Sequence, residues 1–222
     1  MSVTSKGPSQ GARGTKTTRG VGRPPGATGD STRLLILREA RSCFAAYGYA
    51  ATTNRMIAER AGLTTAALYH HFGRKQDLML AVHEVTQDEN YARIRAAIDP
   101  KNTFIAKVQA LLDATHQTLE EDPEQSLFAS VARDEARRHD ELKDILLDRR
   151  FPDLFAELIQ FGISTGELDA GDATAANGVI SILAMGSAFM ATDMSTHTHE
   201  LVTEGCKRLL AGTLLHEVVD SE

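Results

Sequence analysis

The sequence predicts an all-α protein, and three observations support this prediction. Apolar residues recur at intervals of three and four along most of the chain after residue 31, the spacing of one helix face. Capping residues, glycines and prolines separate these periodic stretches. No stretch shows the two-residue alternation of a β-strand. With 222 residues, 42% of them hydrophobic and 24% charged, the chain can bury a substantial core.

The composition also limits where the protein works. The two cysteines lie far apart in helical patterns, so no disulfide framework is expected. The first residues are polar and lack an apolar signal core, and no apolar run is expected to reach the roughly 20 residues that span a bilayer. We therefore expect a cytoplasmic protein without a membrane partner, a cofactor or a bound metal.

Charge is divided unevenly along the chain. Residues 1–77 carry a formal charge of +8 and residues 78–222 carry −14, which gives the net charge of −6. A basic amino-terminal third on an acidic body is typical of a nucleic-acid-binding segment joined to a separate effector domain.

Residues 1–30 are rich in Gly, Ser, Thr and Pro and contain five basic residues against one acid. Such a segment has too little apolar surface to offset its ordering entropy, so we predict a disordered basic tail. Residues 22–26, GRPPG, are similar to an AT-hook, in which Arg23 would enter a narrow minor groove. A plain solvated tail is the other interpretation.

Three short helices are expected in residues 31–77. Ser31 or Thr32 can cap the first, which Gly48 ends. Thr53 can cap the second, and Gly62 supplies a turn before a third helix over 65–72 that Thr64 can cap. A helix this short must be held by packing against its neighbours, as the recognition helix of a helix-turn-helix is.

Residues 78–222 are expected to form a larger helical domain for ligand binding and dimerisation. Its first helix starts near Lys75, and a kink or break is expected at Pro152. The predicted helices span residues 75–97, 102–120, 124–138, 141–161, 173–194 and 199–218.

The helix-turn-helix region resembles the TetR family of bacterial transcriptional regulators. The matching residues are Ala40, Phe44, Gly48, Tyr49, Thr53, the stretches 57–64 and 68–72, Lys75 and Leu78. The resemblance implies a homodimer, paired through helices 173–194 and 199–218, that binds a palindromic DNA operator as a repressor. It also implies release by a small-molecule effector, which shifts the helix that starts near Lys75.

Candidate DNA contacts follow from this placement. Arg55 can reach a guanine edge or a phosphate, and small side chains at the start of the third helix suit a thymine methyl. The resemblance makes Lys75 a phosphate-binding residue, and Ala66 stands where many members carry Gly or Pro. The full set is Arg23, Thr53, Arg55, Thr64, Thr65, Ala66, Ala67, Tyr69, His70 and Lys75.

Candidate ligand contacts are larger side chains on the regulatory helices, each with ordinary core packing as the alternative. They are Tyr91, Leu112, His116, Phe128, Met185 and Phe189. The apolar character of these helices favours a hydrophobic effector, although a core would have the same composition.

Two sequence motifs offer alternatives to a regulator that is not an enzyme: a hydrolase motif and a pair of histidines that could bind a metal. Residues 162–166, GISTG, fit the G-x-S-x-G elbow of a hydrolase with Ser164 as nucleophile, but that motif needs a preceding strand, and helical spacing precedes it here. His197 and His199 have the spacing of a metal pair in an expected loop, without further ligands. A protein-binding module on a regulator-like fold is the third alternative.

Overall fold

The computed structural model describes residues 29–190 and 193–215, and every regular element in those ranges is a helix. This confirms the predicted all-α class. The predicted basic tail and Arg23 lie outside the described residues, apart from the end of the tail. The α-helices are α1 Gly29–Ala51, α2 Asn54–Arg60, α3 Thr65–His71, α4 Lys75–Ile98, α5 Phe104–Glu121, α6 Pro123–Arg138, α7 Arg150–Ser164, α8 Ala173–Met190 and α9 Thr196–Leu210; two 3₁₀ helices are η1 Asp140–Leu147 and η2 Ala170–Asp172.

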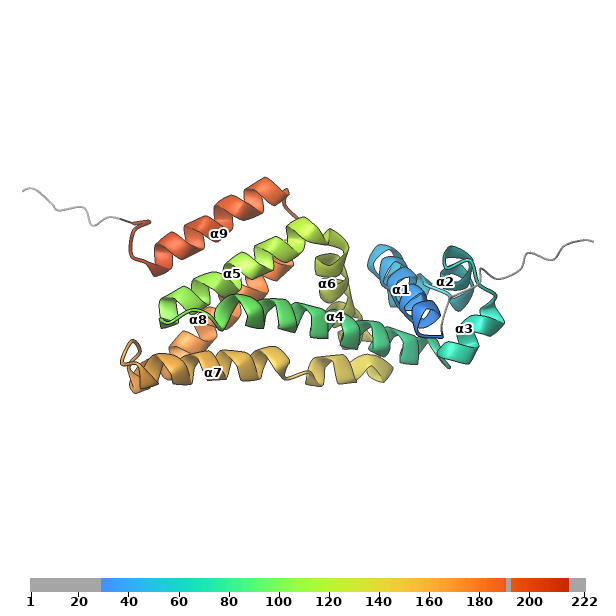
Figure 1. Cartoon of the computed structure of the whole chain (residues 1–222), viewed down its shortest axis with the longest axis horizontal. Coiled ribbons are helices and arrows are strands. Elements are labelled where there is room, and N and C mark those ends of the chain that lie inside the picture. The colour runs from blue at the N-terminus through green and yellow to red at the C-terminus, as the bar shows by residue number, and fades with distance from the viewer. Residues whose placement is uncertain (1–28, 191–192, 216–222) are drawn as a thin grey trace, which may run out of the picture.

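The three amino-terminal helices gather at one end of an elongated molecule (Figure 1). Helix α4 starts beside α3 and runs away from that end, alongside α5 and α7. Helices α8 and α9 lie toward the opposite end, where α9 packs mainly on α5. A single long helix, α4, thus connects the amino-terminal group to the rest of the molecule.

One hydrophobic cluster holds the amino-terminal helices to the rest of the chain. Phe44 of α1 and Phe128 of α6 are fully buried in it, together with Leu68 of α3 and Leu78 of α4. Ile145 of η1 is also a buried member of this cluster. Because α6 and η1 share a core with α1, the division of the chain at residue 77 stays a prediction.

A second cluster lies among α4, α5, α7 and α8. Its buried members include Ile94, Leu111, Phe155 and Ala184. Helix α8 contributes little to it, since only Ile180 and Ala184 of that helix are buried. Most of the apolar surface of α8 is therefore left open in the protomer.

Two predicted helix boundaries are wrong in an informative way. The break expected at Pro152 lies earlier, at Asp148 and Arg149, and Pro152 sits in the first turn of α7. Proline is tolerated there because its missing N–H would have no intrahelical partner. The last helix spans 196–210 instead of 199–218, because Ala211 caps it and Gly212 adopts a φ of 67°.

Helix α8 also corrects the expectation about apolar runs. The segment Ala170–Met190 has 21 residues, and its most apolar stretch has a mean hydropathy of 1.4. By length and composition alone, the segment could cross a bilayer. Within the protein, 11% of that stretch is buried. Its Thr, Ser and Asn residues interrupt the run of apolar residues in the sequence but lower the mean hydropathy only slightly. The predicted helix over 173–194 ends at Met190 in the described residues, and Asp193 and Met194 lie in a turn and a bend.

Candidate nucleic-acid interface and ligand cavity

The turn between α2 and α3 fixes the position of α3. Gly62 has a φ of 65°, a left-handed conformation that favours glycine, and the Leu63 amide donates to Ala58 O at 2.8 Å. Ile57 and Leu68 are fully buried beneath the two helices. Helix α3, seven residues long, is therefore held by packing and not by its own propensity.

The two predicted threonine caps are confirmed. Thr53 Oγ1 accepts from the Met56 amide at 3.2 Å, and Thr64 Oγ1 accepts from the Ala67 amide at 3.1 Å. Each cap satisfies one amide at a helix start that would otherwise lack a partner. Both hydroxyls thus already serve the helices, and both residues remain exposed.

The other predicted contacts of α2 and α3 lie on the outer surface to differing degrees. Ala66, Tyr69 and His70 are exposed, while Thr65 and Ala67 are half-buried. The Arg55 side chain is 81% exposed and pairs with Glu59 at 2.8 Å. Because that pair is fully solvated, the guanidinium can exchange Glu59 for another anion at little cost.

Lys75 is engaged inside the protein. Its Nζ donates to the carbonyl oxygens of Tyr49 at 2.7 Å, Thr52 at 3.0 Å and Ala50 at 3.3 Å, which uses all three ammonium hydrogens. It also lies 4.3 Å from the centre of the Tyr49 ring. Burial lowers the pKa of Lys75. Lys75 thus fastens the start of α4 to the last turn of α1 and to Thr52 just after it.

Replacing Lys75 with methionine tests this fastening role. We expect the free energy of unfolding to fall by about 1–3 kcal/mol, because three carbonyls lose their charged donor. Urea denaturation followed by circular dichroism measures the change. Arg74→Met is the matched control, because the Arg74 side chain is 74% exposed. Equal stability of the two variants would contradict a structural role for Lys75.

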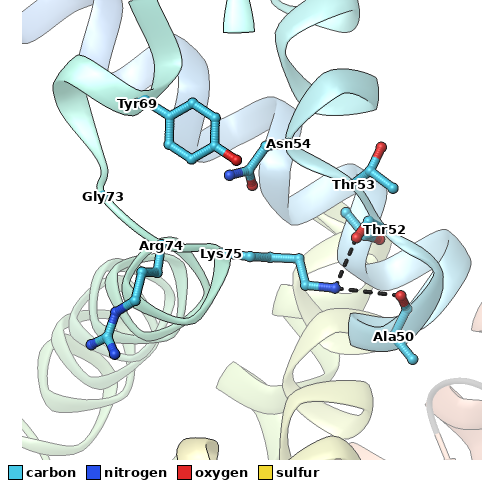
Figure 2. A pocket seen from close by; sticks show the side chains of 8 residues that line it. All are labelled: Ala50, Thr52, Thr53, Asn54, Tyr69, Gly73, Arg74 and Lys75. Atoms are coloured by element: carbon cyan, nitrogen blue, oxygen red, sulfur yellow. Dashed lines mark hydrogen bonds between the residues drawn. The ribbon is translucent and has the colours of Figure 1, made fainter. Parts of the chain in front are cut away.

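A notch of about 360 Å³ opens between α2, α3 and the turn before α4. Figure 2 shows the Tyr69 ring and the Asn54 side chain converging over it, with the Lys75 ammonium at one side and Arg74 pointing outward. Asn54 Oδ1 is buried without a hydrogen-bond partner among the described residues. The notch therefore gathers two cations and several polar groups beside the exposed face of α3.

Sequence reasoning missed Asn54 and Arg74 as members of this notch. A signal was present for each, since Asn54 directly follows the predicted cap Thr53 and Arg74 directly precedes Lys75. Arg74 is also part of a capping box, in which the Arg74 amide donates to Asp77 Oδ2 at 2.9 Å. Their convergence depends on how α1 packs against both α2 and α4, which helical periodicity does not encode.

A larger cavity of about 810 Å³ lies among α4, α5, α6, α7 and α8. Of the six predicted ligand residues, Met185 and Phe189 line it. The other four, Tyr91, Leu112, His116 and Phe128, are not on its wall. Residues that sequence reasoning missed include His83, Gln125 and Asp148.

The four residues outside the cavity wall have other contacts. Leu112 and Phe128 are buried in the interior. The Tyr91 ring packs edge-on against Phe151, with centroids 6.1 Å apart. His116 Nδ1 lies 2.9 Å from His199 Nδ1 in a hydrogen bond between α5 and α9. Periodicity finds the inward face of a helix but does not tell a packed interior from a cavity.

The rival motifs have structural explanations. Ser164 ends α7, where its Oγ donates to Phe161 O at 2.8 Å and Gly166 follows with a φ of 73°. No strand precedes it within the described ranges, so the hydrolase elbow is not supported. The expected loop at His197 and His199 is wrong, since both lie in α9, and no cluster of three metal-ligating side chains occurs in the described part of the chain.

Comparisons with known proteins agree with this geometry. A sequence profile of bacterial regulatory proteins of the tetR family matches residues 36–82. The transcriptional repressor AcnR of Corynebacterium efficiens is 34% identical over 108 residues, which cover 47% of this chain and 50% of that protein. The repressor KstR2 of Mycobacterium tuberculosis is 32% identical over 109 residues, which cover 49% and 53%. The chain thus spans about half the length of the curated relatives it matches.

Solved structures are similar over most of the chain. The ketosteroid regulator KstR2 of Mycobacterium tuberculosis aligns with a TM-score of 0.62 at 22% identity, covering 86% of this chain and 98% of that one. FadR from Bacillus subtilis, in complex with stearoyl-CoA, aligns with a TM-score of 0.66 at 20% identity, covering 82% and 99%. Residues 36–82 thus match the tetR family of bacterial regulatory proteins, and the chain shares the overall fold of these solved structures.

Proposed function

We propose that the protein is a transcriptional repressor that binds an inverted-repeat DNA operator as a homodimer and is released by a small-molecule effector. The observation that supports this most strongly is the exposed face of α3, held by buried Leu68 beside a notch lined by Tyr69 and Arg74. A short helix presented in this way fits the major groove, and a hydroxyl and a cation at its edge fit the phosphate backbone.

Roles for the individual side chains follow from their exposure. Thr65, Ala66 and Ala67, at the start of α3, would face base edges, where their methyl groups suit thymine. Tyr69 and His70 would hydrogen-bond phosphates, as would Arg55 or the newly identified Arg74. Lys75 would act mainly by holding the start of α4 to the end of α1, because its three hydrogens are occupied.

Dimerisation would use the open apolar faces of α8 and α9. Ile182 is 72% exposed, Phe189 60% and Leu201 60%, and further exposed apolar side chains on the two helices are Val179, Met185, Met190, Val202 and Leu209. A contiguous apolar surface of this kind favours a protein–protein interface. A second copy of the chain would place two recognition helices on successive major grooves, about 34–36 Å apart.

The effector would occupy the cavity among α4–α8. The similar regulators of known structure include one in complex with stearoyl-CoA and one that is a ketosteroid regulator, and Phe155, Met185 and Phe189 make much of this cavity apolar as well. We therefore expect an effector whose bulk is apolar. It would act by favouring a position of α4 that changes the distance between the two recognition helices. The two helices would then no longer fit successive major grooves of the operator.

Selection from random-sequence DNA tests this function. We expect enrichment of an inverted repeat, with affinity that falls steeply as salt concentration rises, because phosphate contacts release counterions. Absence of any enriched sequence, with binding that does not respond to salt, would contradict the repressor and favour the protein-binding alternative.

The hydroxyl of Tyr69 is expected to contribute to DNA affinity. Tyr69→Phe should weaken operator binding about 3- to 10-fold, the value of one hydrogen bond, without changing stability, because the residue is 54% exposed. Fluorescence anisotropy at fixed salt measures the affinity. Tyr47→Phe is the matched control, since Tyr47 is 53% exposed on α1 and does not line the notch. Equal affinities for the two variants would remove Tyr69 from the interface.

A further inference from the structure

Several of the polar groups that line the large cavity are engaged within the protein. Thr115 and Thr118 donate to carbonyls of their own helix, at 2.9 Å and 3.0 Å, and Ser181 does the same at 2.8 Å. The Gln125 amide donates to Thr86 O at 3.2 Å. These groups offer a ligand little unused hydrogen-bonding capacity.

Two buried atoms on the cavity wall are exceptions. His83 Nε2, on α4, and Asp148 Oδ2, just before α7, lie 3.4 Å apart. Neither has a hydrogen-bond partner within the described residues, and His83 is only 8% exposed. Because buried polar atoms in proteins are usually paired, this unmet capacity points to a bound group that completes the pair.

The charges around this pair largely cancel. Burial lowers the pKa of His83 more than Asp148 raises it, which favours the neutral imidazole near neutral pH. The Asp148 carboxylate faces Arg150 Nη1 at 3.3 Å, and Arg150 in turn pairs with Glu84 and Asp88. A group bound between His83 and Asp148 therefore gains most if it is polar but uncharged, since the Asp148 carboxylate repels an anion and is already paired with Arg150.

The remainder of the cavity suits an apolar body. Ile94, Leu111 and Phe155 come from the second hydrophobic cluster, and Met185 and Phe189 extend the apolar wall along α8. The volume of about 810 Å³ lies within the range of pockets for drug-sized molecules. The cavity as a whole is amphipathic, and the two buried atoms on its wall that lack a hydrogen-bond partner, His83 Nε2 and Asp148 Oδ2, lie at one place.

We propose that the cavity binds an amphipathic small molecule through an uncharged hydroxyl seated between His83 and Asp148. The hydroxyl donates to Asp148 Oδ2 and accepts from the Nε2–H of the imidazole, so both atoms gain a partner. This assignment rests on the proposed function, because it names the chemical class of the effector and the point where it acts.

The same geometry connects ligand binding to α4. A hydroxyl oxygen with two bonds of about 2.8 Å at a tetrahedral angle prefers partners about 4.5 Å apart, wider than the 3.4 Å of the empty pair. Binding therefore pushes His83 away from Asp148. His83 lies eight residues after Lys75, about 12 Å along α4, so the displacement reaches the point where Lys75 fastens α4 to the amino-terminal helices.

Three long-chain probes test the hydroxyl site. Decan-1-ol, 1-methoxydecane and decanoate have alkyl chains of nine or ten carbons and differ mainly in the head group, and calorimetric titration measures the affinity of each. We expect decan-1-ol to bind about tenfold more tightly than the methyl ether, which cannot donate to Asp148, and more tightly than decanoate. Tighter binding of decanoate, or equal binding of the alcohol and the ether, would overturn the proposal.

Variants locate the effect at this pair. His83→Leu should abolish the preference for the alcohol and leave the melting temperature unchanged or higher, because it removes an unpaired buried polar atom. Ser130→Ala, also on the cavity wall, should retain the preference. Asp148→Asn provides a second test, since its amide oxygen can still accept from the Arg150 amide while its NH₂ cannot accept from the alcohol. Retention of the preference in both His83→Leu and Asp148→Asn would refute the site.

Operator binding, measured on the same samples, separates this inference from the proposed function. We expect decan-1-ol to weaken operator binding by the wild-type protein several-fold and to have no such effect on His83→Leu. If the wild-type protein binds its operator but decan-1-ol leaves that affinity unchanged, only the hydroxyl site fails. If no operator is found, the repressor function itself fails, whatever the probes do.

Discussion

Replacing Phe128 with alanine is expected to destabilise the protein by about 3–5 kcal/mol, the cost of deleting a fully buried aromatic ring and leaving a void. Phe128 is 0% exposed in the cluster that joins α6 to the amino-terminal helices. The void therefore weakens the contact that orients the amino-terminal helices. Urea denaturation followed by circular dichroism measures the loss.

The neighbouring Leu127 provides the control for this prediction. It lies on the same helix and is 37% exposed, so Leu127→Ala should cost less than about 1 kcal/mol. If Phe128→Ala instead keeps its stability and changes only the response to an effector, Phe128 belongs to the ligand site after all, and the cavity wall described above is incomplete.

A charge in the proposed dimer interface is expected to remove most of the operator affinity. Leu201→Glu should convert the protein to a monomer and weaken operator binding by at least about 100-fold, because a monomer engages only one half-site. Leu201 is 60% exposed, so the protomer itself should keep its stability. Analytical ultracentrifugation and anisotropy on the selected operator measure the two effects.

The same substitution elsewhere separates dimerisation from general surface damage. Leu147 on η1 is 68% exposed and lies apart from α8, α9 and the notch, so Leu147→Glu should leave both assembly and affinity unchanged. A Leu201→Glu protein that remains dimeric with full affinity would place the interface on another surface.

The amino-terminal half of the fold could be predicted from the sequence because its signals are local. Thr53 and Thr64 cap helices through amides three residues ahead, and Gly62 supplies the turn between them through its own backbone conformation. Interactions over three or four residues are encoded in the order of residues, so the helix-turn-helix and the exposed residues of α3 were identified in place.

Sites built by distant segments could not be predicted in the same way. Lys75 contacts carbonyls 23 to 26 residues earlier in the chain, and His83 meets Asp148 across 65 residues. The inward face of a helix looks alike whether it meets a packed core, as Phe128 does, or a cavity, as Phe189 does. Helical spacing alone cannot distinguish the two.

The sequence by itself determined the helical class, the helix caps and the recognition element, because each depends on backbone propensity and near neighbours. Only the tertiary structure decided that Lys75 is a fastening residue, that Asn54 and Arg74 share a notch with Tyr69, and that His83 Nε2 and Asp148 Oδ2 face one another on the cavity wall. These arrangements arise from how α1 packs against α2 and α4, and from how η1 packs against α4. Packing geometry depends on all the contacting side chains together and not on any one stretch of sequence.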